Sequence, residues 1–220
     1  MREFPRSPIS PAELLEQYLP AAFAASTRPA YAADLSLALG VRLVGAGGGE
    51  WVLDLRGGDV RVRAGSRAQT AFTYSQSVED WRGALWEGRG AALGRGAAAL
   101  FHPGAPEVEA AVGLFGAGVP AAIAALADLR GLVRASVTSD SGDDWCVDLQ
   151  LGPGEIASAP TTELCVSAAD ADRMASGELK PIEAFMAGRV RILGDMGLLF
   201  QIQAAQMQAA EARAAGSGRR

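Results

Sequence analysis

The sequence is poor in the residue types from which most catalytic and metal sites are built. Its 220 residues include one histidine, His102, and two cysteines, Cys146 and Cys165. A His-based triad or metal site would have to use His102, which stands in the turn-like stretch Leu-Phe-His-Pro-Gly and is expected to be exposed. Each cysteine lies in a strand-like run, which favours free buried thiols over a disulfide. We therefore expect no catalytic residue, no metal and no cofactor.

Charge and hydropathy argue against two further kinds of partner. The 20 basic and 25 acidic residues give a net charge of -5 and are spread along the chain. They do not form the basic patch that binds a nucleic-acid backbone. The longest apolar run, residues 116–127, is shorter than the roughly 20 residues of a spanning helix, and the first ten residues lack the apolar core of a signal peptide. We expect a soluble, cytoplasmic protein with no nucleic-acid partner and no transmembrane segment, although a transient membrane contact is compatible with this composition.

The hydrophobic residues, 49% of the chain, follow a pattern that occurs twice. The segment Glu-Trp-Val-Leu-Asp-Leu begins at position 50, and Asp-Trp-Cys-Val-Asp-Leu begins at position 144, 94 residues later. In both copies a capping box follows, with Ser77 three residues before Asp80 and Ser167 three residues before Asp170. The two copies therefore predict two units of the same order, alternating strands followed by a capped helix.

This repeat predicts how the chain is divided. The four parts are a first unit over residues 12–104, a helical connector packed between the units over 105–132, a second unit over 133–209 and a disordered tail over 210–220. Alternating apolar residues predict strands around positions 41–43, 51–55, 60–62 and 70–74 in the first unit. In the second unit they predict strands around 133–137, 145–149 and 164–166, with a weak strand near Ile156. Asp54 and Asp148 occupy matching places and are expected to be solvated.

The stretch ELKPIEAFMAGRVRILGDMGLLFQIQ, residues 178–203, predicts a helix, a strand and a second helix. In the second helix Met196, Leu199, Phe200, Gln203 and Met207 fall at i, i+3, i+4, i+7 and i+11, which places them on one wide and largely apolar face. Such a face belongs either to an ordinary core or to the lining of an apolar pocket.

These residues resemble the C-terminal part of the sterol carrier protein 2 family, where a helix of the pattern Gly-x-x-x-Pro-x-x-Ala-Phe-x-x-Gly, a strand and a helix after a Gly-Asp turn recur. The upstream segments DWCVDL and VSAADADRMASG are similar to the family's central strands and following helix. The similarity covers about 133–208 and is much weaker over 12–104, where ALGRGAAALFHPG lacks the Gly-Asp-Met-Gly turn. The resemblance implies a five-stranded sheet covered by helices, with a tunnel between them for sterols, fatty acyl chains or other lipids.

We therefore expect an α+β protein of two tandem units of this type, each a mainly antiparallel sheet of about five strands covered by helices, with the first unit degenerate. The expected function is to bind, and to transfer or present, a sterol, fatty acyl chain or other isoprenoid in an internal pocket. Two alternatives stay open: an enzyme that uses the same cavity as a reaction chamber, and a non-binding interaction module. The oligomeric state is not determined by these patterns. The expected ligand-binding residues are Leu164, Val166, Phe185, Met186, Ile192, Met196, Leu199, Phe200 and Met207.

Deletion of residues 210–220 tests the predicted tail. Their composition, Ala-rich and ending in Gly-Ser-Gly-Arg-Arg, offers no apolar face that could offset the entropy of ordering them. We expect the melting temperature of the shortened protein to stay within about 2 °C of the full chain in a thermal scan. A clear drop would show that the last helix packs beyond residue 209.

Overall fold

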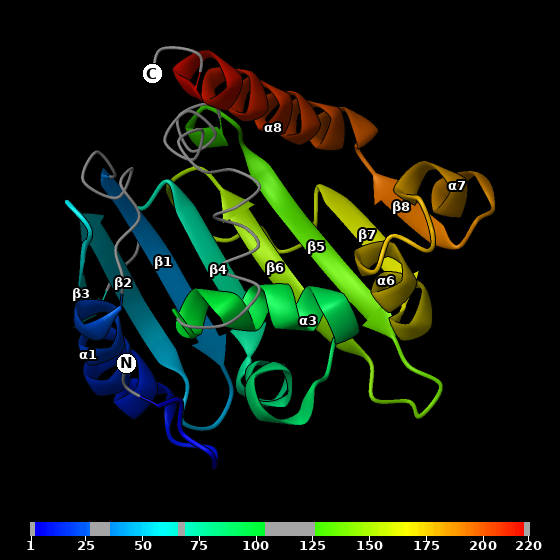
Figure 1. The fold of residues 1–220 in the computed structure, drawn as a ribbon. Coiled ribbons are helices and arrows are strands. Elements are labelled where there is room, and N and C mark those ends of the chain that lie inside the picture. The colour runs from blue at the N-terminus through cyan, green and yellow to red at the C-terminus, as the bar shows by residue number, and fades with distance from the viewer. Residues whose placement is uncertain (1–2, 27–35, 66–68, 104–125, 218–220) are drawn as a thin grey trace.

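The computed structural model describes residues 3–26, 36–65, 69–103 and 126–217, which form one mixed sheet with helices on one of its faces (Figure 1). The strands are β1 (Ser36–Val44), β2 (Gly49–Arg56), β3 (Asp59–Ala64), β4 (Phe72–Ser77), β5 (Gly131–Thr138), β6 (Trp145–Leu151), β7 (Thr162–Ser167) and β8 (Val190–Gly194). The helical elements are η1 (Glu13–Tyr18), α1 (Leu19–Ala25), α2 (Val78–Arg82), η3 (Gly83–Glu87), α3 (Ala91–Ala98), η4 (Ala99–Phe101), α6 (Ala168–Ala175), α7 (Pro181–Met186) and α8 (Met196–Ser217).

The eight strands form a single sheet in the order β3-β2-β1-β4-β6-β5-β7-β8. The predicted α+β class is confirmed, but the two separate five-stranded sheets are not observed. The weak strand predicted near Ile156 is also wrong, because residues 152–161 contain no strand. Gly152 and Gly154 adopt φ of +90° and +104° on either side of Pro153, a backbone that cannot continue a strand.

The strand pairing repeats between the two halves of the sheet. In the first half β1 is antiparallel to β2 and parallel to β4, and in the second half β5 is antiparallel to β6 and parallel to β7. Trp51 lies opposite Val41, and Trp145 lies opposite Val137. This recurrence supports the predicted internal repeat, although the degenerate first unit stays a prediction.

The two halves join because each has one strand edge that its own half does not cover. The outer neighbour of β2 is β3, whereas β6 has no such neighbour from the second half and pairs with β4 instead. Phe72–Ser75 of β4 lie antiparallel to Asp148–Leu151 of β6. Phe72 and Leu151 form a buried cluster with Leu198 of α8. The junction is therefore both a hydrogen-bonded ladder and a packed core, and the fold makes one body of the two predicted units.

Asp148 of β6 lies on the face of the sheet opposite to that of its neighbour Leu149. It was expected to be solvated, but Arg134 lies directly opposite it on β5 and donates two hydrogen bonds to its carboxylate, at 2.7 and 2.8 Å. Its counterpart Asp54 forms an ion pair with the more exposed Arg56. The bidentate hydrogen bonding to Asp148 raises the pKa of the Arg134 guanidinium, so Arg134 is charged at neutral pH.

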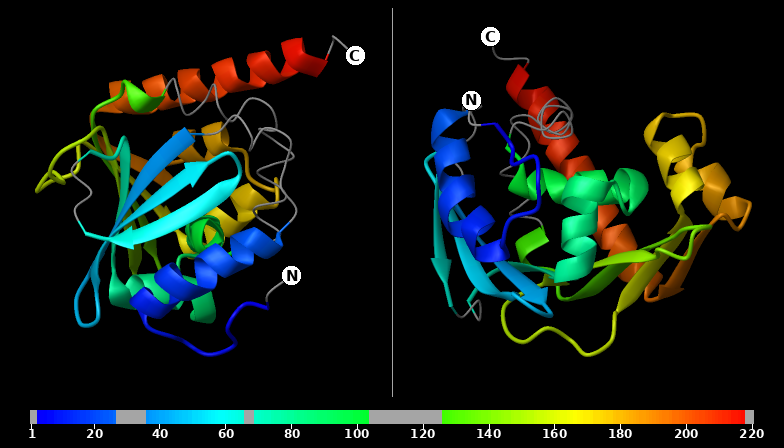
Figure 2. Two further views of the ribbon diagram at one scale, coloured as in Figure 1. Left: turned by 90° about the vertical axis from the view of Figure 1, so that its left-hand side faces the viewer. Right: turned by 90° about the horizontal axis from the view of Figure 1, so that it is seen from below.

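The helices lie on the concave side of the curved sheet (Figure 2). Over the first half, Leu14, Leu15 and Leu19 of η1 and α1 pack against Trp51 and Leu53. The helices that follow β4 and β7 begin as the sequence predicts. Ser77 Oγ accepts a hydrogen bond from the Asp80 amide at 2.9 Å, and Ser167 Oγ accepts one from the Asp170 amide at 3.1 Å.

The structure describes most of the predicted tail but little of the predicted connector. Most of the predicted connector, residues 105–125, lies outside the described residues, and the two halves contact each other directly through β4 and β6. Helix α8 continues to Ser217, so the helix extends eight residues past the predicted boundary at 209. Its alanine-rich sequence has a high helix propensity, which explains continuation without an apolar face.

Truncation of Leu151 tests whether the junction stabilises the whole molecule. Leu151 is 1% exposed at the centre of the sheet, so Leu151→Ala should lower the free energy of unfolding by about 2–5 kcal/mol. Leu193→Ala is the matched control on the exposed side of β8 and should change it by about 0.5 kcal/mol or less. Denaturant unfolding of both variants, followed by circular dichroism, checks this. Equal effects of the two changes, or two separate transitions in the parent protein, would contradict the single-body description.

Candidate functional site

The centre of the helix-covered face contains an exposed leucine. Leu149 of β6 lies directly opposite the buried Tyr74 on one side and opposite Val133 on the other. Residues directly opposite in a sheet point to the same face, so Leu149 points toward the helices. It is nevertheless 36% exposed, while Leu151, two residues along the same strand, is 1% exposed. Among the described residues, the helices therefore cover Leu149 less completely than its neighbours in the middle of the sheet.

An apolar strip continues from Leu149 across the second half. Ala135 of β5 lies opposite Leu164 of β7, which lies opposite Ile192 of β8. Ala135, Leu164 and Ile192 are each only partly buried. Because strands are spaced by about 4.8 Å, the strip from β6 to β8 is about 14 Å long. We call Val133, Ala135, Leu149, Leu164 and Ile192 the apolar strip.

The strip contains two of the nine predicted ligand-binding residues, Leu164 and Ile192. The third predicted strand residue, Val166, lies on the same face but is 3% exposed, in a cluster with Trp145 and Val190. Val166 is therefore covered by its neighbours and has little surface left for a ligand.

Helix α8 turns a different side to the sheet than the predicted one. The buried residues of its first three turns are Leu198 and Ala205, with Ile202 packed against Phe72 and Leu151. The predicted residues lie on other sides of the helix: Leu199 is partly buried, and Met196, Phe200 and Met207 are exposed, with 61% for Phe200. The face of α8 predicted from the sequence and the face that packs in the structure are both apolar. Contact with Phe72 of the first half places Leu198 and Ile202 on the packed side.

Helix α7 also presents its predicted residues to solvent. Ala184 is fully buried against the sheet, whereas Phe185 is 36% and Met186 is 78% exposed. A helix of six residues can turn one side to the core, and here the small alanine occupies that side. Phe185 and Met186 thus do not join Leu164 and Ile192 around one enclosed volume.

Sequence reasoning missed Leu149, Val133 and Ala135. The signal was present, because Trp145, Val147 and Leu149 alternate in the segment DWCVDL and must share one face. The pattern predicts that face but not how completely helices cover it. The position of the covering helices follows from the long-range pairing of β4 with β6.

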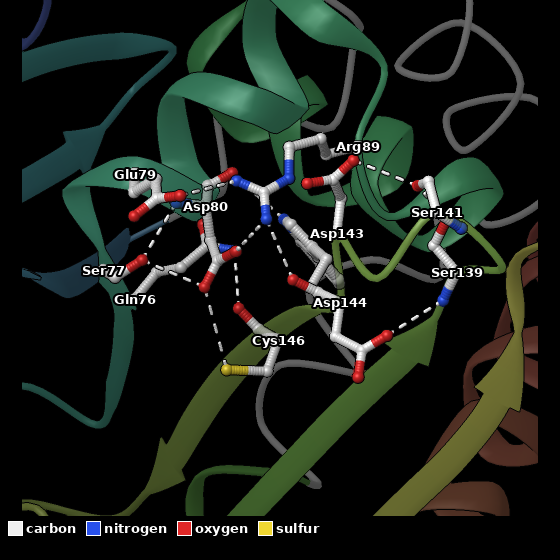
Figure 3. A network of polar contacts seen from close by, with 11 residues as sticks. Gln76, Ser77, Glu79, Asp80, Arg89, Ser139, Ser141, Asp143, Asp144 and Cys146 are labelled. Atoms are coloured by element: carbon white, nitrogen blue, oxygen red, sulfur yellow. Dashed lines mark hydrogen bonds and ion pairs between the residues drawn. The ribbon is translucent and has the colours of Figure 1, made fainter.

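A polar network closes one end of the junction (Figure 3). Arg89 points its guanidinium between the carboxylates of Glu79 and Asp80, at 3.3 and 3.7 Å, and donates a hydrogen bond to the carbonyl of Asp144 at 3.0 Å. Asp80 also accepts from Ser77, and Gln76 donates to the carbonyl of Cys146 at 2.7 Å. The network ties the capped helix of the first half to the start of β6, and so holds the register that places Leu149 beside Tyr74.

Two titratable groups on the paired strands β4 and β6, Tyr74 and Cys146, are held in their uncharged forms. Burial and the nearby Asp80 raise the pKa of the Cys146 thiol, which stays protonated at neutral pH. Burial likewise raises the pKa of Tyr74, whose hydroxyl donates to the side-chain oxygen of Gln76. Both cysteines are free, as predicted, but each is partly buried where a buried thiol was expected. His102 was expected to be exposed but is partly buried, with its ring centroid 4.4 Å from that of Phe4.

The described residues thus define an α+β protein with an apolar, partly open face between its sheet and its helices. Residues 115–207 match the sequence model of the SCP-2 sterol transfer family, so this part of the chain is an SCP2 family domain. The domain includes β5 to β8 and the first part of α8. In the described part of the chain, no helix combines the length and hydropathy needed to cross a bilayer.

Two relatives and one solved structure illustrate the similarity. Hydroxysteroid dehydrogenase-like protein 2 of Xenopus tropicalis is 30% identical over 79 residues, which are 34% of this chain and 19% of that protein. Sterol carrier protein 2 of Rattus norvegicus is 33% identical over 73 residues, 31% of this chain and 13% of that protein. The chain thus spans less than a fifth of the length of these relatives. The solution structure of the sterol carrier protein domain 2 of Helicoverpa armigera is 26% identical, covers 40% of this chain and 74% of that one, and has a TM-score of 0.30.

Truncations on α8 test which of its sides packs. Leu198→Ala should lower the free energy of unfolding by about 2–5 kcal/mol, because Leu198 is 3% exposed in a cluster with Phe72 and Leu151. Phe200→Ala should change it by about 0.5 kcal/mol or less, because most of its side chain is in solvent. Chemical denaturation of the two variants decides the point, and a reversed order would restore the face predicted from the sequence.

Proposed function

We propose that the protein binds an apolar small molecule, a fatty acyl chain or a sterol, against the apolar strip, and carries it without changing it chemically. The observation that supports this most directly is the exposure of Leu149 in the middle of a sheet face that helices otherwise cover. Burying such surface under a ligand contributes about 25 cal/mol per Å² of apolar area removed from water. A strip of five aliphatic side chains therefore offers affinity through burial.

The family match supports the chemical class of the ligand. The second half is an SCP2 domain, the family description names sterol transfer, and a relative with 33% identity is named sterol carrier protein 2. We transfer from these names only the general class, an apolar lipid. A cytoplasmic location and a transient membrane contact during loading stay part of this proposal and rest on the sequence.

The two alternatives, an enzyme and an interaction module, are distinguished by the residues that each of them needs. An enzyme needs a group that moves a proton or forms a bond, whereas the five side chains of the strip are all aliphatic. An interaction module needs an outward apolar surface, and Ile182 and Met186 of α7, 66% and 78% exposed, provide one. Binding at the strip and contact through α7 are compatible with each other, so the first is tested by itself.

Enlarging the side chain at position 149 tests the proposed binding. Leu149→Trp adds an indole where the ligand would lie, so we expect the affinity for a fluorescent fatty-acid probe to fall by about tenfold or more. Leu55→Trp is the matched control, because Leu55 occupies the corresponding place in the first copy of the repeated segment and packs in the first half's own core. Its effect on probe affinity should stay within about twofold.

Probe titration and thermal melting of the parent and both variants complete this test. If Leu149→Trp folds and binds the probe as the parent does, the site lies elsewhere. If the parent itself binds neither a fatty-acid nor a sterol probe, the proposed function is wrong, and the apolar surface of α7 becomes the better guide to function.

A further inference from the structure

We propose that helix α3 of the first half is a lid over the apolar strip, which must lift before an apolar ligand can lie on the strip. This inference rests on the proposed function and deepens it. It assigns the control of ligand entry to a helix that lies outside residues 115–207, the segment that matches the SCP2 family. The hinge of the lid is the turn before α3, and its latch is an ion pair with α6.

Helix α3 covers the row of side chains on which the ligand would lie. It begins near β5, which it contacts, and runs across β6 toward β4 (Figure 1). It packs in the same cluster as Val147, Leu164 and Ile192. Val147 lies opposite Ala135 of the apolar strip, so these four residues form one row across the second half. A ligand on this row needs space that α3 occupies, and it can therefore bury the strip only when α3 moves.

Few large side chains hold α3 in this position. Its sequence is AALGRGAA, so Leu93 is its one large apolar residue, and its other residues in the cluster are alanines. Gly94 and Gly96 lower its intrinsic helix propensity. A β-carbon at Gly96 would meet no atom within 4 Å, so packing does not require a glycine there. The N-terminal helices η1 and α1, by contrast, bury three leucines completely, Leu14, Leu15 and Leu19. Helix α3 is therefore easier to displace than η1 and α1.

An exposed ion pair latches α3 to the second half. Arg95 donates a hydrogen bond to Asp172 of α6 at 2.9 Å, and the two side chains are 46% and 52% exposed. Such pairs contribute little to stability, because water and salt screen them. Both residues line a polar cleft of about 340 Å³ between the start of α3, the turn from β5 to β6 and the start of α6. The packing around the latch is thus incomplete, which leaves room for the helix to move.

The turn before α3 has the conformation of a hinge. Gly88, Gly90 and Ala91 have φ of +72°, +79° and +51°. Among the described residues, Ala91 is the one non-glycine residue with a positive φ, a backbone that is strained when a β-carbon is present. Movement of α3 would let Ala91 adopt an ordinary φ. Arg89 stays attached to the carbonyl of Asp144 and to two carboxylates of α2 (Figure 3), so the helix can swing while its base is held.

A covalent lock at the latch tests the lid. In the full-length double variant Arg95→Cys/Asp172→Cys, a bismaleimide with a disulfide in its spacer joins α3 to α6, and tryptic mass spectrometry identifies the joined positions. We expect the association rate of a fluorescent fatty-acid probe to fall by about tenfold or more, because the crosslink removes the open form that binds. Reduction of the spacer should restore the rate. The matched control is the same variant with both new cysteines blocked by N-ethylmaleimide, and its rate should stay within about twofold of the parent chain.

Hydrogen exchange of the unmodified chain gives a second measurement that needs no substitution. A lifted α3 is short and contains two glycines, so it cannot keep its own hydrogen bonds. Its amides should therefore exchange about tenfold or more faster than the amides of residues 14–19 in the N-terminal helices. Equal protection of the two segments would show that α3 does not lift.

The outcomes separate this inference from the function beneath it. If the crosslinked protein binds the probe as fast as the blocked control, the lid is wrong while lipid binding stands. If the parent chain binds neither a fatty-acid nor a sterol probe, the proposed function itself fails. A loss of binding on crosslinking that reduction reverses supports both.

Discussion

The antiparallel pairing of β4 with β6 is the contact on which the rest of the structure depends. Each half ends in a strand whose backbone groups would otherwise face solvent, and an unpaired edge is a liability for a soluble protein. The second half forms no strand over residues 152–161, which leaves β6 free to accept β4. One ladder therefore satisfies the edges of both halves and joins them into one sheet.

This joined sheet explains the uneven distribution of helices over it. The N-terminal helices pack tightly on the first half, where Leu14 and Leu15 are fully buried, while Leu149 on the second half stays partly open. The polar network around Arg89 also links the two halves next to the start of β6. A preformed apolar surface suits a ligand that is held by burial.

The comparison with the family clarifies what the first half adds. The SCP2 domain covers residues 115–207, yet its helix α8 rests on Phe72 and its strand β6 pairs with β4, both from outside the matched segment. The domain in this chain is thus completed by residues that belong to the first half of the sheet. Exposed apolar side chains of α7 and α8 lie outside this completed core and remain free for other contacts.

The sequence by itself determined the local elements and their repetition. Alternation predicted the strands around Trp51 and Trp145, and the spacing of Ser167 and Asp170 predicted a helix start, because periodicity and capping act over a few residues. Only the tertiary structure decided which strand edges meet and which side of α8 is buried. Both Leu198 and Phe200 are apolar and lie two residues apart, so the local pattern allows either side, and burial against Phe72 and Leu151 selects one. The exposure of Leu149 depends on the same long-range contact, which no short window of sequence contains.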